Sequence, residues 1–184
     1  MVDHYFHQNF FSQEEVVQLN QHIESNYNQI ETAKNQSVKD NGYSKNNTKI
    51  LMINIYKIKD LVSRLESYVK YVNESYFGFD VYPFNDHDTC LLNIYKPDGE
   101  YDYHTDHSRN DVFDIKLTVL ANLSTQDFEG GDFKIFNGGE YDVPGFRPSG
   151  SILIFKSYLS HKVSPIISGE RRSLTIFARG PHLK

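Results

Sequence analysis

The sequence predicts a mainly β protein, an antiparallel sandwich or barrel with two N-terminal helices packed on one of its sheets. Apolar residues recur at helical spacing in two segments before residue 80, and beyond residue 82 short β-type runs alternate with Gly, Pro, Asp and Asn turns. The aromatic share of 14%, nearly all Tyr and Phe, also suits β structure. At 184 residues we expect one domain, with residues 1–80 as helical support and residues 81–184 as the β core.

Both helices are predicted from local signals. A capping box from Ser12 to Glu15 opens the first helix, whose apolar residues continue at helical spacing to about Ala33. The second helix is predicted between Ile58 and about Tyr76, where apolar residues recur at i, i+3, i+4 and i+7. One apolar stripe on each helix indicates that both pack on the same body.

Residues 34–49, between the helices, are rich in Asn, Ser, Lys and Gly and are predicted to be a loop. A surface loop is the simpler interpretation, and a mobile flap near the active centre is the alternative.

About seven or eight strands are expected after residue 82. The β-type runs are residues 89–95, 115–124, 132–136, 151–155, a short run near 161–163, and 171–179. Turns are predicted between them, at residues 97–99, 129–131 and 137–139. No internal repeat or linker indicates a second domain.

Composition excludes several function classes. A net charge of -5 disfavours binding dominated by nucleic-acid phosphates, although a local basic groove stays possible. With Cys90 as its one cysteine, the chain can form no intrachain disulfide and no thiolate-rich metal site. Neither a signal peptide nor a membrane-spanning segment is recognisable, so we expect a soluble, cytoplasmic protein that does not act on membranes.

His104, Asp106 and His161 are the candidate metal ligands. Two imidazoles and one carboxylate on one face hold a non-haem iron and leave positions open for a co-substrate and oxygen. A strand end that runs into a turn can aim His104 and Asp106 at one point, with His161 supplied by a distant strand. The His-x-Asp spacing alone is a weak signal, since this composition produces it by chance about half the time.

Arg171, ten residues after His161, is the candidate anion-binding residue. Strand alternation places Arg171, Ser173 and Thr175 on one face and Leu174 on the other. A guanidinium inside a barrel needs a partner, and the distal carboxylate of a dicarboxylic acid supplies one through two parallel hydrogen bonds. Arg172 faces the other way and is interpreted as a structural residue.

The same alternation applies to the strands that carry Tyr95 and His161. Tyr95 is expected to face inward with Asn93, where its hydroxyl could meet the same carboxylate; a purely structural buried tyrosine is the alternative. His161 is expected to point into the barrel, with Lys162 on the wet outer face.

Taken together, these residues resemble the prolyl-4-hydroxylase-like branch of the iron(II)/2-oxoglutarate dioxygenases. That family's pattern is a Tyr, a Gly turn, a second Tyr and His-x-Asp, followed by a distal His with Arg or Lys ten residues later. The matching positions here are Tyr95, Gly99, Tyr101, His104, Asp106, His161 and Arg171. Runs at residues 9–15, 118–124, 129–131 and 150–155 look like further family elements in order, so the resemblance covers nearly the whole chain.

The resemblance implies a double-stranded β-helix, or jelly-roll, core with the two helices on its major sheet. It implies Fe(II) held by His104, Asp106 and His161, and 2-oxoglutarate chelating the metal with its far carboxylate on Arg171, Tyr95 and Thr118. Oxygen would be the second co-substrate and ascorbate a reductant, with succinate and CO₂ released as a carbon is hydroxylated. Tyr101 is a candidate substrate contact, with an aromatic rim residue as the alternative.

Several questions stay open at this point. The substrate is expected to be a peptidyl proline, with a free amino acid or small metabolite as the alternative, and neither substrate class nor oligomeric state can be read from the motifs. Nucleic-acid demethylation is less favoured because the chain is acidic. A noncatalytic metal- or ligand-binding module is the alternative from another class. The cluster at residues 86–88 lacks a spaced third partner and is interpreted as a solvated turn.

Overall fold

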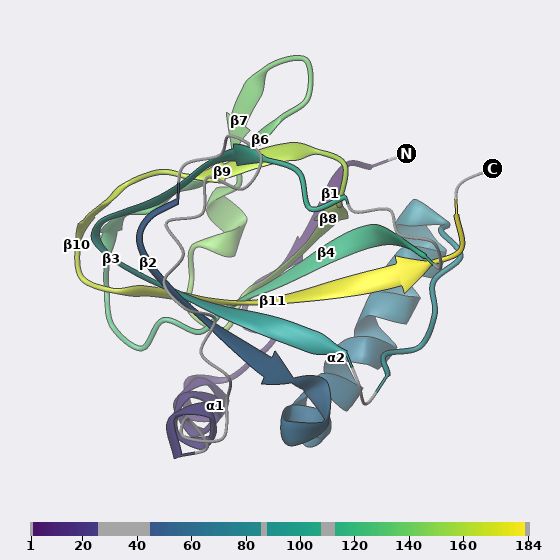
Figure 1. The fold of residues 1–184 in the computed structure, drawn as a ribbon, viewed down its shortest axis with the longest axis horizontal. Helices are drawn as coiled ribbons and strands as arrows, with labels where there is room; N and C mark the ends of the chain where they lie inside the picture. Colours follow the sequence, from purple (N-terminus) through teal and green to yellow (C-terminus); the bar gives the residue numbers. More distant parts are fainter. Residues whose placement is uncertain (1, 26–44, 86–87, 108–112, 183–184) are drawn as a thin grey trace.

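In a computed structural model, the chain folds as a curled antiparallel β-sheet with two helices on one face (Figure 1). The structure describes residues 2–25, 45–85, 88–107 and 113–182. The strands are β1 (His4–His7), β2 (Lys45–Asn54), β3 (Thr89–His104), β4 (Asp114–Asn122), β5 (Glu129–Gly130), β6 (Phe133–Phe136), β7 (Glu140–Asp142), β8 (Ile152–Lys156), β9 (Ser160–Val163), β10 (Ile166–Ser168) and β11 (Arg171–Gly180). The helical segments are α1 (Gln13–Ser25), η2 (Ile55–Ile58), α2 (Lys59–Val72), η3 (Asn73–Phe77) and η4 (Pro144–Phe146).

The long strand β3 joins the two halves of the curled sheet. Strand order is β1-β8-β4-β11-β3-β9-β6-β7, with β2 also paired to β3 and a separate ladder of β10 with β5. The first half of β3 pairs with β11, and its last residues pair with β9. The sheet therefore folds over on itself and encloses an interior, which confirms the predicted jelly-roll fold class.

A wide bulge in β3 makes this change of partner possible. From Tyr95 to Glu100, β3 advances five residues while β2 advances two, from Thr48 to Asn46. Asp98 in this bulge has a φ of 65°. The Pro-Asp-Gly turn predicted here is thus a bulge within one strand, and bulges of this kind bend and re-aim the strand that carries them.

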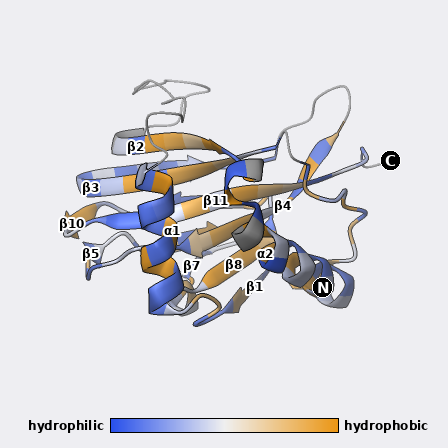
Figure 2. Ribbon diagram, turned by 90° about the horizontal axis from the view of Figure 1, so that it is seen from below, coloured by the Kyte–Doolittle hydropathy of each residue, from blue (hydrophilic) through white to orange (hydrophobic). Residues whose placement is uncertain are grey.

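Both helices cover the convex face of the larger half-sheet, as predicted. In Figure 2 the strands β11 and β8 are largely orange where α1 and α2 lie across them. The capping box is confirmed, since Ser12 N donates to Glu15 Oε2 at 2.7 Å and Glu15 N donates to Ser12 Oγ at 3.2 Å. The buried apolar side chains of this layer include Val16, Leu19, Ile23, Val62, Leu65, Val69, Val72, Leu92, Leu117, Val119, Ile154, Leu174 and Ile176. Within the described ranges, no helix is long and apolar enough to cross a membrane.

The enclosed interior has a second, smaller apolar cluster and a polar wall. Tyr95, Phe133 and Phe155 belong to this cluster. On the same side of β11, Thr175 Oγ1 accepts a hydrogen bond from Asn93 Nδ2 at 3.1 Å. The alternation predicted for β11 is confirmed, because its apolar side chains pack beneath the helices while its polar ones face the interior.

Strands near the N-terminus are where the sequence-based prediction was wrong. The division at residue 80 into helical support and β core does not describe the sheet, since β1 and β2 both belong to it. Residues 45–49, predicted as loop, form the start of β2. In β2, Leu51 and Ile53 are buried while Met52 is exposed. This alternation is too short to predict a strand from the sequence when polar residues precede it. The rest of the predicted loop and the end of the first predicted helix lie outside the described residues.

Candidate metal centre and carboxylate pocket

His104, Asp106 and His161 come together where β3 ends beside β9. One ligand atom from each lies within 4.8 Å of the others. His104 Nε2 is 3.6 Å from Asp106 Oδ1, and His161 Nε2 is 3.3 Å from Asp106 Oδ2. The two histidines face each other because His104, the last residue of β3, is paired in register with His161 on β9. Two imidazoles and a carboxylate converging in this way form a donor set that suits a divalent first-row metal.

Backbone carbonyls select the tautomer of both imidazoles. His104 Nδ1 lies 2.8 Å from the carbonyl oxygen of Asp102, and His161 Nδ1 lies 3.0 Å from that of Leu159. Since a carbonyl oxygen can only accept, Nδ1 must carry the proton in each ring. Nε2 is then the ring nitrogen that faces Asp106 in each histidine, and it is the atom through which each imidazole could ligate a metal.

Asp106 is held although it lies beyond the end of β3. Its backbone N–H and that of His107 both donate to the carbonyl oxygen of Ser157, each at 3.0 Å. Its Oδ2 accepts a hydrogen bond from Thr118 Oγ1 at 2.8 Å. Burial favours a higher pKa for this carboxyl group, but His161, His104 and Thr118 outweigh burial and lower the pKa below its ordinary value of 3.8. Asp106 is therefore ionised and acts only as an acceptor.

Aromatic rings pack against both histidines of the cluster. The ring of Tyr101 stacks on His104 with centroids 3.5 Å apart, and Phe155 contacts His161 edge to face at 4.7 Å. Phe133 lies 5.4 Å from the ring of His161. These rings fix both imidazoles and keep water from their flanks.

Arg171 is the first residue of β11 and lies directly opposite Tyr95 in the pairing of β11 with β3. It is 2% exposed, and its guanidinium carbon lies 5.3 Å from the ring centre of Tyr95 and 5.6 Å from that of Phe146. Its Nη1 donates to Ser173 Oγ at 3.3 Å. Burial is the main cause that lowers the pKa of Arg171 below its ordinary value.

A buried cation of this kind calls for an anionic partner. Within the described ranges, no carboxylate lies in salt-bridge distance of the Arg171 guanidinium. The side chain lines a cavity of about 180 Å³ together with Asn122, Phe133, Phe146 and Arg147. Phe133 touches both this cavity and the His161 ring, so the charged pocket and the three clustered residues are neighbours. A carboxylate entering here would satisfy the guanidinium.

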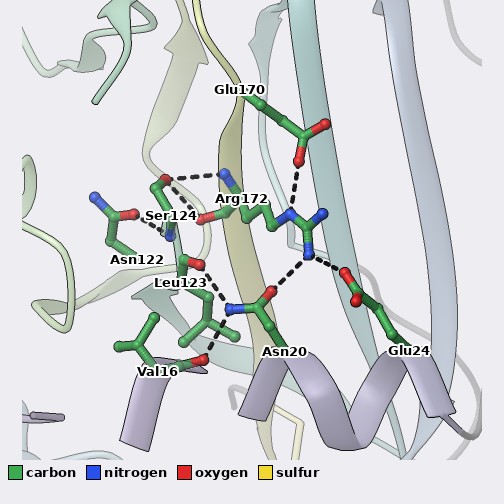
Figure 3. Close-up of polar contacts among 8 residues, drawn as sticks. All are labelled: Val16, Asn20, Glu24, Asn122, Leu123, Ser124, Glu170 and Arg172. Atoms are coloured by element: carbon green, nitrogen blue, oxygen red, sulfur yellow. Dashed lines mark hydrogen bonds and ion pairs between the residues drawn. The ribbon is translucent and has the colours of Figure 1, made fainter. Parts of the chain in front are cut away.

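The neighbouring Arg172 points to the opposite side of β11, toward α1 (Figure 3). Its Nε donates to Glu170 at 2.7 Å, and its Nη1 donates to Asn20 at 2.8 Å and to Glu24 at 2.7 Å. It ties α1 to the sheet, which confirms the structural role predicted for it.

Two predicted site residues have contacts that the sequence did not indicate. Thr118, expected at the far carboxylate, donates to Asp106. Tyr101, expected to touch substrate, stacks on His104. Both predicted roles stay predictions. Ser157, which anchors the Asp106 backbone, was not predicted at all, because no sequence motif marks a carbonyl that serves as an anchor.

None of the other histidines that the structure describes belongs to this cluster. Among described residues, the three clustered side chains are the one group of three or more His, Cys, Asp or Glu placed to hold a metal ion. His7 contacts Tyr68, and His182 contacts Asp114. Of the acidic turn at residues 86–88, the first two residues lie outside the described chain, and Asp88 pairs with Arg179.

Comparisons with known proteins agree with this geometry. A sequence model of the 2OG-Fe(II) oxygenase superfamily matches residues 90–179. A PKHD-type hydroxylase of Synechococcus sp. (strain CC9605) is 40% identical over 75 residues, which are 39% of this chain and 32% of that protein. The match thus spans about a third of the length of this curated relative.

Solved structures share the fold. A Pseudomonas putida prolyl-4-hydroxylase superposes with a TM-score of 0.72 at 19% identity, covering 98% of this chain and 94% of that one. A Trichoplax adhaerens prolyl hydroxylase, in complex with a hypoxia-inducible-factor peptide fragment, gives a TM-score of 0.70 at 20% identity, covering 96% of this chain and 83% of that one. At these identities, the structures establish likeness of fold.

Proposed function

We propose that this chain is an iron(II)- and 2-oxoglutarate-dependent hydroxylase of an unactivated carbon, acting on a peptidyl substrate in the manner of prolyl 4-hydroxylases. The match of residues 90–179 to the 2OG-Fe(II) oxygenase superfamily supports this proposal. One observation carries the proposal: the ligand atoms of His104, Asp106 and His161 lie within 4.8 Å of one another.

The three residues fit iron(II) by their chemistry. Two imidazoles that turn Nε2 toward one carboxylate supply the ligand types of the facial triad that serves non-haem iron oxygenases. The carbonyl oxygens of Asp102 and Leu159, which fix the tautomers, do the orienting work that second-layer partners do in metal sites. The triad uses only three positions, which leaves room for a chelating co-substrate and oxygen.

Arg171 fits the far carboxylate of 2-oxoglutarate. Among the described residues, the buried guanidinium makes one hydrogen bond, to Ser173 Oγ at 3.3 Å, so it keeps donors for a bidentate carboxylate. Tyr95 lies opposite Arg171 in the strand pairing and is proposed as the second contact. The two tasks, metal capture and carboxylate capture, are thus assigned to separate side chains.

When bound, iron(II) and 2-oxoglutarate would supply the oxidising chemistry, with O₂ as oxidant, succinate and CO₂ as products, and ascorbate as a supporting reductant. The chain's own part is to bind and orient. Phe133 and Phe155 exclude water from the flank of His161, and Tyr101 covers His104. Tyr101 is partly exposed beside His104, so it is the proposed contact for the incoming substrate.

A peptidyl substrate is favoured because the chain has nearly full-length likeness to prolyl hydroxylases, one of them in complex with a peptide. The test is a succinate-release assay with Fe(II), 2-oxoglutarate and oxygen, screened against proline-containing peptides, free amino acids and oligonucleotides. Succinate formation coupled to a hydroxylated peptide supports the proposal. Turnover coupled only to a free amino acid or another metabolite would reassign the substrate. No coupled turnover with metal-loaded protein in any class would favour a noncatalytic binding module.

A further inference from the structure

Thr118 is fully buried on β4 with its hydroxyl directed at Asp106. The side chain is 0% exposed, and Oγ1 lies 2.8 Å from Asp106 Oδ2. Since the ionised carboxylate can only accept, the hydroxyl must be the donor. We propose that Thr118 is a positioning residue, whose hydroxyl holds the Asp106 carboxylate in the orientation in which it ligates the metal. The inference rests on the metal centre proposed above.

The carboxylate of Asp106 needs such a restraint. Asp106 follows the end of β3. The carbonyl oxygen of Ser157 accepts a hydrogen bond from its backbone N–H and leaves the side-chain torsions unrestrained. The terminal torsion of an Asp side chain is broad, so rotation would exchange the two oxygens at little cost. Oδ1 faces His104 at 3.6 Å and Oδ2 faces His161 at 3.3 Å. Rotation would therefore change the donor set that a metal meets.

The position of Thr118 favours one orientation of the Asp106 carboxylate. A β-branched side chain on a strand has restricted χ1, so its hydroxyl is aimed before any ligand arrives. β4 is paired on both sides, to β11 at Phe177 and to β8 at Phe155, which fixes the backbone beneath Thr118. A rigid donor thus meets a carboxylate on an irregular segment.

This role competes with the one predicted from the sequence, in which Thr118 binds the far carboxylate of 2-oxoglutarate. A hydroxyl group has a single proton to donate. If that proton is on Asp106 Oδ2, as the 2.8 Å contact indicates, it cannot also be given to a second carboxylate. The two roles therefore predict different losses when the hydroxyl is removed.

The experiment is a titration with Co(II), an oxygen-stable probe whose visible absorption reports on its ligands, carried out without 2-oxoglutarate. Thr118→Val keeps the shape of the side chain but removes the donor, and we expect it to weaken Co(II) binding about 10- to 100-fold and to change the Co(II) spectrum. Thr118→Ser keeps the donor and should bind within about threefold of wild type. Thr175→Val is the matched control, because Thr175 is buried in the same interior and bonds Asn93 instead of Asp106; its Co(II) affinity should be unchanged.

Wild-type Co(II) affinity in Thr118→Val, combined with weakened 2-oxoglutarate binding to the Co(II)-loaded variant, would overturn the inference and restore the sequence-based role. Equal losses in Thr118→Val and Thr175→Val would also overturn it, since the effect would then be general to buried threonines. Failure of wild type itself to bind Co(II) would reject the metal centre, and is thus distinct from failure of the positioning role. Circular dichroism establishes that each variant is folded. If Thr118→Val does not fold, Thr118→Ala replaces it in the same comparison.

Discussion

His104 and His161 occupy directly opposed positions on β3 and β9, and each gives its Nδ1 proton to the carbonyl oxygen two residues before it. The pairing register therefore sets the distance between the two imidazoles, while local backbone sets their tautomers. Both features come from contacts of the chain's own backbone.

Replacing His161 with alanine should abolish succinate formation and metal binding together. The variant removes one of three donors, and the remaining His104 and Asp106 cannot complete a facial triad. His107→Ala is the matched control, since His107 lies next to the site but outside the cluster. Metal affinity by calorimetry and succinate by a coupled assay provide the readouts. Normal turnover in His161→Ala would contradict the ligand assignment.

Arg171→Ala should weaken 2-oxoglutarate binding about 10- to 100-fold, because charge-assisted hydrogen bonds contribute about 1.5 to 3 kcal/mol. Metal affinity should be retained, as no clustered ligand contacts Arg171 among the hydrogen bonds of the described residues. The measurement is 2-oxoglutarate affinity of the metal-loaded protein. Unchanged 2-oxoglutarate affinity would place the far carboxylate elsewhere.

Arg172→Ala, one residue along the same strand, should lower stability and leave 2-oxoglutarate affinity unchanged, which is the opposite of the effect expected for Arg171→Ala. It removes the contacts to Glu170, Asn20 and Glu24, so the free energy of unfolding should fall by about 1 to 2 kcal/mol. Affinity for 2-oxoglutarate should stay at the wild-type value. Chemical denaturation and ligand titration of both variants test this division of tasks, and a loss of affinity in Arg172→Ala without loss of stability would refute it.

Glu140 should contribute to the acid sensitivity of the fold. Hydrogen bonds from Tyr103 first, and then from Lys134 and Lys162, lower the pKa of Glu140 from 4.5 to about 2. Because the folded-state pKa is below the unfolded one, this contribution is present above pH 4.5 and is lost as pH falls toward about 2. The contribution is small because the side chain is exposed.

The corresponding variant is Glu140→Gln, which keeps the shape but cannot ionise. Thermal midpoints measured between pH 5 and about 2 should fall less steeply with acid than those of wild type. An equally steep or steeper fall would show that Glu140 does not carry the effect.

Local signals in the sequence were enough for part of the structure. The capping box at Ser12 and Glu15 and the alternation around Arg171 depend on neighbouring residues only, so both could be predicted. Strand β2 could not, since its polar first half is paired to β3 across a bulge that no local pattern encodes.

The candidate site also has a part that the sequence predicts and a part that it does not. Residue types and spacing singled out His104, Asp106, His161 and Arg171, and the structure brings the first three together. The contact between Thr118 and Asp106 could not be predicted from the sequence, because it depends on how β4 lies beside the segment after β3.

The most direct measurement is visible absorption of the purified protein given Fe(II) and 2-oxoglutarate without oxygen. A bidentate complex of 2-oxoglutarate with iron on the triad should produce a charge-transfer band in wild type and His107→Ala and none in His161→Ala. A band of equal strength in His161→Ala, or none in wild type, would contradict the proposed centre.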